Sequence, residues 1–353
     1  MAVTPISYAD ARVNGANGRA LAVGGIALQN AAVLAPMSGI TDAPFRRMVA
    51  KLGAGLVISE MTASEGLANG AAGPRLRTEG QSVGIHVVQL AGCQARWMGE
   101  GARVAEASGA QIIDINMGCP AKKVINGYAG SALMRDLDHA MSLIEATVSA
   151  VSVPVTLKMR LGWDHRSINA PELARRAEQA GVQMITVHGR TRCQFYSGSS
   201  DWAAIRSVKA AVQIPLVANG DIGDFAGADA ALSASAADAV MIGRAALGRP
   251  WLPGQIGRYL QTGESEGAPS LDVQKSLLEM LYEEILSHYG IAIGLRHARK
   301  HLRAAIDFAV ASVGAEWGAV RALRTQILTA QYPALVRRGI DEAYDAVAWR
   351  LVA

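Results

Sequence analysis

Short apolar runs recur between residues 31 and 244, and nearly all of them end in a residue that can bind a ligand or move a proton. The residues at these ends are Pro36 with Met37, Gln89, Asn116, Lys158 with Arg160, His188, Asn219 with Gly220 and Asp221, and Gly243 with Arg244. One polar residue after an apolar run ordinarily starts a solvated loop. Their recurrence after so many runs indicates a common site instead.

The last two of these ends are typical of a phosphate site. Gly220 and Gly243 permit close approach of the backbone, and Arg244 adds a permanent positive charge. No Gly-x-Gly-x-x-Gly motif follows any run, so a dinucleotide site of the doubly wound kind is not indicated. FMN, with one phosphate and one flavin ring, fits this pattern. Gln89 would then bond the ring edge, and Lys158 would place positive charge near N1–C2, unless Lys158 is simply an interior lysine paired with a carboxylate.

Cys119 lies between Gly118 and Pro120, directly after one of the runs. A lone cysteine is more often a small buried hydrophobe, and that interpretation suits Cys93 and Cys193. A thiol on a loop over a ligand site is placed to give a proton or to act as a nucleophile, and position alone does not separate the two roles. The glycine-rich stretch that runs on to residue 130 is expected to move as a lid.

The apolar runs themselves predict buried parallel strands. They cover residues 31–36, 56–61, 86–90, 111–116, 155–160, 184–189, 215–220 and 239–244. Amphipathic stretches separate them, and eight strands joined by helical crossovers predict an α/β fold, a TIM-type (β/α)₈ barrel, in which all strand ends meet at one mouth. A doubly wound open sheet is the competing architecture. The number and even spacing of the runs favour the barrel, with residues 24–30 forming a short hairpin at its bottom.

The pattern changes after residue 254. A polar linker over 261–270 is followed by helical periodicity over 271–289, 293–311, 317–329 and 340–351, which predicts a small all-helical domain. Arg296, Arg299, Lys300 and Arg303 recur at helical spacing and share one face. Such a face is usually only solvated, but no acidic residue interrupts it, and this favours a surface that follows phosphates. The neighbouring histidines, surrounded by cations, do not predict a metal site.

Composition bounds these interpretations without deciding them. The chain has 353 residues, a formal net charge of +4 and three widely spaced cysteines, so a disulfide framework or a zinc site is not expected. No signal-peptide pattern and no apolar stretch of membrane-spanning length occurs. We therefore expect a cytoplasmic protein with no membrane partner, whose first residues form a loose arm.

Several long motifs resemble one family. They are PMSGITDAPFRRM (36–48), DINMGCPAKKVINGYAGSALM (114–134), KMRLGWD (158–164), HGRTRCQFYSGSSDW (188–202), ANGDI (218–222) and MIGRAALGRPWL (241–252). In this order they resemble the bacterial tRNA-dihydrouridine synthases, and most closely their B branch. The resemblance covers about residues 24–255, and it implies an N-terminal arm over 1–23, an FMN-binding barrel over 24–255 and a helical tRNA-binding domain over 256–353.

The resemblance also implies the roles of single residues. FMN would be held by Pro36, Met37, Ser38, Gln89, Lys158, His188, Asn219, Gly220, Asp221, Gly243 and Arg244. NADPH would reduce the flavin, Cys119 would protonate C5 of a flipped uracil, and Asn116 and Arg160 would contact its polar edge. The basic face of residues 296–303 would bind tRNA, although the family's ARKHLGWY pattern here reads ARKHLRAA. A monomer is expected.

Two other function classes compete with this interpretation. An FMN barrel acting on a small pyrimidine-like molecule, as dihydroorotate dehydrogenases do, would not need the basic helical domain. A non-catalytic RNA-binding protein on a retired barrel would not need the loop around Cys119. Flavin content and salt-sensitive RNA binding separate the three.

Overall fold

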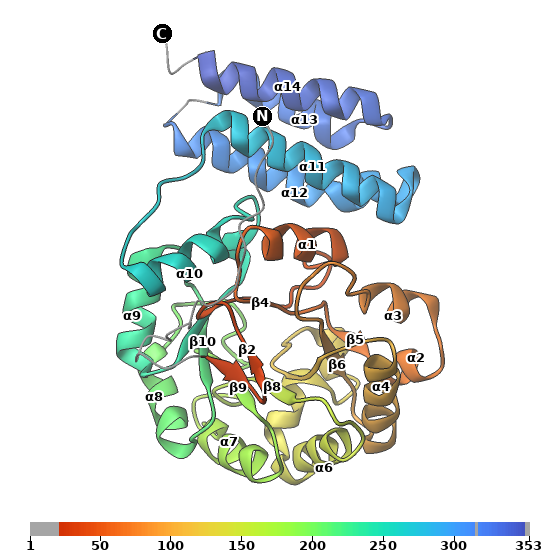
Figure 1. The fold of residues 1–353 in the computed structure, drawn as a ribbon, viewed down its shortest axis with the longest axis vertical. Coiled ribbons are helices and arrows are strands. Elements are labelled where there is room, and N and C mark those ends of the chain that lie inside the picture. The colour runs from red at the N-terminus through yellow and green to blue at the C-terminus, as the bar shows by residue number, and fades with distance from the viewer. Residues whose placement is uncertain (1–20, 315–316, 350–353) are drawn as a thin grey trace.

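The computed structural model describes residues 21–314 and 317–349, and in them the apolar runs form one curled parallel sheet (Figure 1). Within these residues the sheet has nine strands, in the order β4-β3-β11-β10-β9-β8-β7-β6-β5. Their bounds are β3 (Ala32–Leu34), β4 (Leu56–Val57), β5 (Thr62–Ala63), β6 (Val87–Ala91), β7 (Ile112–Met117), β8 (Val155–Arg160), β9 (Met184–His188), β10 (Leu216–Asn219) and β11 (Ala239–Ile242). A parallel bridge between Ile58 and Val87 joins the end of β4 to β6 and closes the sheet. The predicted TIM-type barrel is confirmed.

The second barrel strand differs from the sequence prediction. One strand was expected over 56–61, whereas the structure has two short strands, β4 and β5, with a break between them. Ser59 and Glu60 in the break are buried. The Ser59 hydroxyl accepts a hydrogen bond from the Gln89 N–H, and a Glu60 carboxylate oxygen accepts one from the Gly39 N–H. These two polar side chains find partners on β6 and on the turn after β3, so the chain leaves the strand ladder at this point.

The barrel interior below the mouth is filled by apolar side chains. Val33, Leu56, Ile112 and Met184 are among the strand residues in this cluster, all nearly inaccessible to solvent. The antiparallel hairpin of β1 (Ala22–Val23) and β2 (Ile26–Ala27) adds its own buried side chains to the same cluster. It therefore closes the bottom, as expected, and leaves the opposite end of the barrel open for a site.

Helices surround the sheet (Figure 1). They are α1 (Ala43–Lys51), α2 (Ser64–Ala68), α3 (Ala72–Arg77), α4 (Ala95–Ala107), α5 (Lys122–Ile125), α6 (Leu137–Val148), α7 (Ala170–Gln179), α8 (Trp202–Ala211), α9 (Phe225–Ser235) and α10 (Leu252–Thr262), with 3₁₀ turns η1 (Gly130–Arg135) and η2 (Arg244–Ala246). Aspartates cap α1, α6, α8 and α9, because each accepts a hydrogen bond from a backbone N–H in the first turn. These caps fix where each helix begins after its loop.

Four further helices form a layer beyond α1 and α10, as Figure 1 shows. They are α11 (Leu271–Tyr289), α12 (Ile291–Ser312), α13 (Gly318–Thr329) and α14 (Pro333–Trp349). The predicted helical appendage is therefore present, but α14 begins at Pro333 rather than at 340. Aromatic contacts tie this layer to the barrel: Trp251 lies against Phe308, and Phe45 lies against His301.

The proposed domain limits fall in or near regular elements. Residues 22 and 23 belong to the hairpin, and most of the proposed arm lies outside the described residues. The limit at 255/256 falls inside α10, which packs on the barrel side, and the stretch without regular structure is 264–270. No helix in the described ranges is long and apolar enough to span a bilayer.

Candidate active site at the barrel mouth

Strand register brings the predicted residues together in two tiers. In the lower tier Gln89 of β6 pairs with Asp114 of β7, which pairs with Thr156 of β8. In the upper tier Arg160 pairs with His188 of β9, and His188 with Asn219 of β10. Side chains alternate along a strand, so residues two apart face the same side. Lys158 therefore lies between these tiers, on the same face of β8 as Thr156 and Arg160.

A buried hydrogen-bond network forms the floor of the site. The Gln89 amide donates to the Asp114 carboxylate over 2.6 Å, and the Thr156 hydroxyl donates to the other Asp114 oxygen over 2.6 Å. The Asn116 amide donates to the Gln89 oxygen over 2.8 Å. Burial raises the pKa of Asp114, while the hydrogen bonds from Thr156 and Gln89 and the charge of Lys158 oppose that shift. Sequence reasoning did not assign a role to Asp114 or Thr156, although both lie in strand positions that face Gln89.

The backbone on both sides of Cys119 is fixed by residues from two elements, β7 and η1. The Asn116 oxygen accepts hydrogen bonds from the N–H groups of Cys119, over 3.0 Å, and Gly118, over 3.3 Å. The hydroxyl and the N–H of Ser131 donate to the Cys119 carbonyl. The thiol itself is half-buried. Asn116 thus holds the cysteine loop as well as the side-chain amide of Gln89, so it has a positioning role whatever it contacts in the substrate.

The loop after Cys119 is more ordered than the glycine-rich sequence suggested. It contains the short helix α5 and the 3₁₀ turn η1. Gly130 has φ of +60°, and a Cβ there would approach the Cys119 carbonyl to 2.8 Å. A side chain at this position would therefore push the cysteine out of place, which explains the glycine without requiring a moving lid.

Lys158 and His188 occupy the centre of the mouth. The Lys158 ammonium reaches past β9 and donates to the Asn219 side-chain oxygen over 3.1 Å, while the Asn219 amide donates to the Met241 carbonyl. Burial and the nearby Arg160 lower the pKa of Lys158 to about 8. Burial and the surrounding cations, Lys158 first, lower the pKa of His188 to about 2, so this imidazole is neutral. Its buried Nδ1 has no hydrogen-bond partner among the described residues, so this atom can form a hydrogen bond with a ligand.

Arg160 is almost fully buried and braces two loops. Its Nε donates to the Gly118 carbonyl, and its Nη1 donates to the carbonyls of Thr191 and Phe195. Burial lowers its pKa to about 10, so the guanidinium is charged. These bonds leave Nη2 as the part of Arg160 that can meet a substrate. The sequence motif placed Arg160 at the mouth but did not predict that it fixes the cysteine loop.

A cradle for an anion lies where β10 and β11 end. The backbone N–H groups of Gly220, Asp221, Gly243 and Arg244 donate to no other residue in the described part of the chain. Gly220 has φ of +117°, and a Cβ there would collide with the Ser200 hydroxyl at 2.1 Å. Gly243 has open space on its Cα, because a Cβ there would come no closer than 3.8 Å to another atom. Converging free N–H groups are the usual protein partners of a phosphate.

Arginine side chains make this cradle positive. Arg190 is buried and donates to both carboxylate oxygens of Asp221, and the exposed Arg244 pairs with the same carboxylate over 3.2 Å. The Ser200 N–H also donates to Asp221. Burial alone would raise the pKa of Asp221, but the bonds from Arg190 and Ser200 lower it overall. The Asp221 carboxylate is therefore engaged, and only its backbone N–H remains for an anion.

The turn after β3 closes the ring of predicted cofactor residues. Met37 and Pro36 are half-buried and Ser38 is exposed. A Cβ on Gly243 would lie 3.9 Å from the Met37 sulfur, so Met37 borders the cradle. On the opposite side of the mouth a cleft of about 740 Å³ separates the loops after β3, β5, β6 and β7 from the helical domain, with Lys123 and His297 among its lining residues. Of the predicted cofactor residues, Ser38 lines this cleft.

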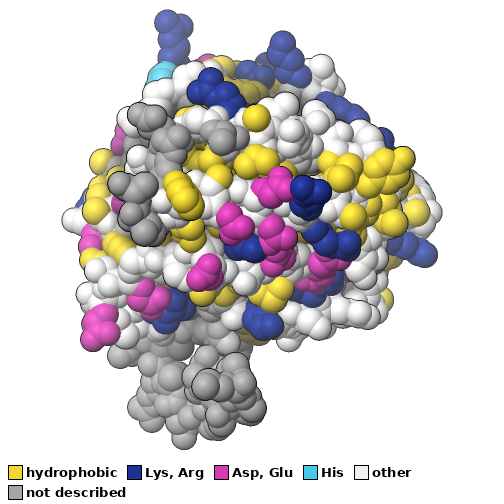
Figure 2. All heavy atoms as spheres, turned by 90° about the horizontal axis from the view of Figure 1, so that it is seen from above, with side chains coloured by type: hydrophobic (Ala, Val, Ile, Leu, Met, Phe, Trp, Pro, Cys, Tyr) yellow, Lys and Arg dark blue, Asp and Glu magenta, His cyan; other side chains and the backbone are white. Residues whose placement is uncertain are grey.

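The predicted basic face on α12 is only partly free. Arg296 is exposed and Arg299 is half-buried, and neither makes an ion pair with another described residue. Arg303 lies 3.7 Å from Asp307, and the Lys300 ammonium donates to the Gly39 carbonyl in the barrel. Seen from the end that carries the helical domain, acidic and basic side chains are interspersed (Figure 2), as in the ion pairs of α14 with α11. The cations of the helical domain that were predicted from sequence and that lack an ion-pair partner among the described residues therefore lie on α12.

Comparison with known proteins decides the family. The sequence model described as dihydrouridine synthase matches residues 33–327. The chain belongs to the dihydrouridine synthase family. A probable tRNA-dihydrouridine synthase of Rhizobium leguminosarum bv. phaseoli is 50% identical over 324 residues, 92% of this chain and 98% of that protein. A tRNA-dihydrouridine synthase B of Xanthomonas axonopodis pv. citri is 49% identical over 272 residues, 76% of this chain and 82% of that protein. The resemblance carried by the motifs is confirmed.

A solved structure supports the architecture of this dihydrouridine synthase. Morphinone reductase superimposes with a TM-score of 0.51 at 14% identity, covering 75% of this chain and 94% of that chain. At this identity the similarity concerns the fold alone. It agrees with the closed parallel sheet and with a mouth formed by the carboxyl ends of the strands.

Proposed function

We propose that this dihydrouridine synthase reduces the C5–C6 double bond of uridine in tRNA, with FMN as its cofactor and Cys119 as the proton donor. The observation that carries the proposal is the placement of Cys119. Its loop is fixed by Asn116, Ser131 and Arg160 beside a ring of polar strand ends. In a chain of this family, such a thiol is placed to protonate a substrate that lies over these polar strand ends.

The residues at the mouth fit FMN. Four free backbone N–H groups and Arg244 suit one phosphate, and Gly243 leaves the space that a side chain would fill. Lys158 provides positive charge in the centre, and the neutral His188 presents an unpartnered Nδ1. Bound FMN supplies the hydride that adds at C6 of the uracil, with NADPH as the source of the electrons.

The chain's own residues complete the addition. Hydride at C6 leaves negative charge on C5 and on the conjugated carbonyl, and one proton must reach C5. Cys119 can provide that proton as a general acid, and solvent returns it to the thiol. Arg160, through its free Nη2, can stabilise the charge that develops on the carbonyl oxygen. The uracil must leave its stack to reach this site, because C5 and C6 are inaccessible in stacked RNA.

The tRNA would approach along α12 and the cleft beside it. Arg296 and Arg299 provide cations that no described acidic group neutralises, and Lys123 lines the cleft close to the cysteine loop. Contacts of this kind bind phosphates without reading bases. We expect the enzyme to act as a cytoplasmic monomer, which size-exclusion chromatography of the flavin-loaded protein would test.

Product formation gives the direct test. The purified protein, FMN, NADPH and unmodified tRNA transcript should yield dihydrouridine, detected by mass spectrometry of the digested RNA. Mapping dihydrouridine in tRNA from cells that lack the gene should reveal the missing positions. Turnover of free pyrimidines without any product in tRNA would instead favour the small-molecule alternative.

A further inference from the structure

Lys300 connects the two parts of the molecule rather than facing solvent with the other cations of α12. Its ammonium donates to the Gly39 carbonyl in the turn that follows β3. The contact is close: a Cβ on Gly39 would lie 2.7 Å from the Lys300 nitrogen. Gly39 has φ of +71°, which disfavours any other residue in this turn. The backbone of the turn therefore offers its carbonyl to Lys300, and position 39 has no room for a side chain.

The backbone of Gly39 is also held by a residue of the barrel. Its N–H donates to the carboxylate of Glu60, which is buried in the break of the second barrel strand. The turn is also closed on itself, because the N–H groups of Ile40 and Thr41 donate to the Met37 carbonyl and the Thr41 hydroxyl accepts from the Met37 N–H. Residue 39 is thus fixed by an anion of the barrel and a cation of the helical domain. Met37, two residues earlier, borders the phosphate cradle.

We propose that Lys300 and Glu60 clamp the turn at Gly39, so that this one contact, and not docking of the helical domain in general, sets the position of Met37 and Ser38 at the flavin site. Lys300 is then a positioning residue and not a phosphate contact of the RNA face. The inference rests on the proposed flavin site. It deepens that site by making its geometry depend on one contact between the domains.

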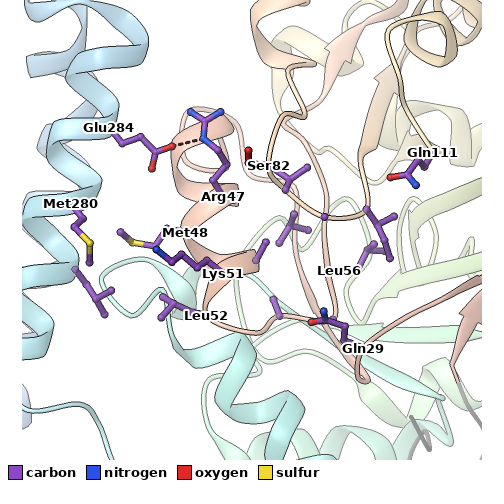
Figure 3. A pocket seen from close by; sticks show the side chains of 18 residues that line it. Gln29, Arg47, Met48, Lys51, Leu52, Leu56, Ser82, Gln111, Met280 and Glu284 are labelled. Carbon is purple, nitrogen blue, oxygen red and sulfur yellow. Dashed lines mark hydrogen bonds and ion pairs between the residues drawn. The ribbon is translucent and has the colours of Figure 1, made fainter. Parts of the chain in front are cut away.

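A second contact between the domains supplies a matched control. Arg47 of α1 forms an ion pair with Glu284 of α11, and Figure 3 shows the two side chains pointing toward one another. They line a groove of about 900 Å³ between α1 and α11, which does not include any residue of the predicted flavin site. Breaking this pair should loosen domain docking without touching the turn at Gly39.

The experiment measures FMN binding by the flavin-free full chain, followed by quenching of flavin fluorescence. Lys300→Met keeps the length of the side chain and removes its charge. If one charge-assisted hydrogen bond sets the population of the competent turn, FMN affinity should fall about tenfold and flavin release should quicken. Lys300→Arg should restore most of the affinity, and Glu284→Gln should leave it unchanged. The salt dependence of tRNA binding, measured at saturating FMN, should stay as in the wild type.

Two results would overturn the clamp. Wild-type FMN affinity in Lys300→Met would show that the contact does not support the flavin site, and a flatter salt dependence would assign Lys300 to RNA. An equal loss in Glu284→Gln would mean that domain docking in general, not this contact, is responsible. If Lys300→Met fails to fold by circular dichroism, Lys300→Gln, which also removes the charge and leaves the turn at Gly39 unaltered in sequence, provides the same measurement. Failure of the proposed function is separate, since it would appear as a wild-type protein that binds no FMN or forms no dihydrouridine.

Discussion

Replacing Cys119 separates proton transfer from every other function of the mouth. The backbone of this residue is held through its N–H and its carbonyl by Asn116 and Ser131, and these bonds do not involve the thiol. No described residue forms a hydrogen bond with the sulfur of this half-buried side chain. We therefore expect Cys119→Ser and Cys119→Ala to keep the loop in place, with a change in the free energy of unfolding of no more than about 1 kcal/mol.

The expected loss of rate is much larger than that structural effect. General acid catalysis contributes roughly 10²–10⁴-fold, which corresponds to about 2.7–5.5 kcal/mol of activation free energy. A loop shift worth about 1 kcal/mol would slow the reaction only about fivefold. The magnitude of the loss therefore distinguishes a missing acid from a displaced loop.

The assay is anaerobic single-turnover reoxidation of the reduced enzyme by unmodified tRNA. Flavin absorbance and the rate of reduction by NADPH should be close to wild type in both variants, since neither uses this proton. Cys93→Ala and Cys193→Ala are matched controls, because these cysteines lie on the loops after β6 and β9 of the same barrel. A Cys119 variant slowed less than fivefold would remove this residue from proton transfer. A comparable loss at Cys93 or Cys193 would move the acid there.

Three further outcomes are expected. Arg244→Ala should weaken FMN binding by roughly 1–2 kcal/mol, less than a buried charged contact, because Arg244 is exposed and shares Asp221 with Arg190; unchanged affinity in fluorescence titrations would place Arg244 off the phosphate. Arg296→Gln together with Arg299→Gln should lower tRNA affinity and flatten its dependence on salt, with NADPH oxidation in the absence of tRNA unaffected; a salt slope equal to wild type would show that this face is merely solvated. FMN affinity should fall as pH rises through about 8, where Lys158 loses its charge, and Lys158→Arg should abolish that step. The same shift has the opposite effect on the free energy of unfolding. The pKa of Lys158 in the folded protein is about 8, below the usual 10.5, so between these two values the unfolded chain binds more protons. The contribution of Lys158 to the free energy of unfolding therefore increases with pH over this range. The unfolding free energies of wild type and Lys158→Met, compared at pH 7 and pH 10, would contradict this if their difference stayed constant.

The barrel could be predicted from sequence because its strands have a one-dimensional signal. Each strand is buried on both faces and appears as a continuous apolar run, and a polar or glycine residue marks where it reaches the mouth. The signal failed where a polar pair interrupted a run. Ser59 and Glu60 divide the second strand, since their partners, Gln89 of β6 and Gly39 of the turn after β3, are distant in sequence and no local pattern reveals them.

The start of α14 was missed for a related reason. The helical periodicity was predicted only from 340, whereas Pro333 and Gly339 also belong to the helix. Proline suits a first helical turn. A Cβ on Gly339 would approach Ile327 of α13 to 2.5 Å, so this glycine permits close packing of two helices instead of ending one. The distinction depends on a contact between helices and not on the local sequence.

Most hydrogen-bond partners of the site residues could not be predicted either, because they also lie far away in the sequence. These partners change the interpretation of the site. Arg160 and Asn116 were expected to face the substrate, yet most of their hydrogen bonds hold the loops around Cys119. Arg190, which was assigned no role, fixes Asp221 and with it the cradle.

Buried positive charge gives the mouth a preference for an anion before any ligand arrives. Burial first, and then the charges of Lys158, Arg160, Arg190 and Arg244, lower the pKa of His188 and keep it neutral. Asp114 and Asp221 are the carboxylates that face these cations in the hydrogen bonds and ion pairs described above, and burial disfavours the charged form of Asp114. Burial is the main cause of the lowered pKa values of Lys158 and Arg160, and repulsion from neighbouring arginines adds to it. An anionic ligand in the cradle would offset both costs, so the charges at the mouth favour an anion there and the build-up of negative charge beside Cys119.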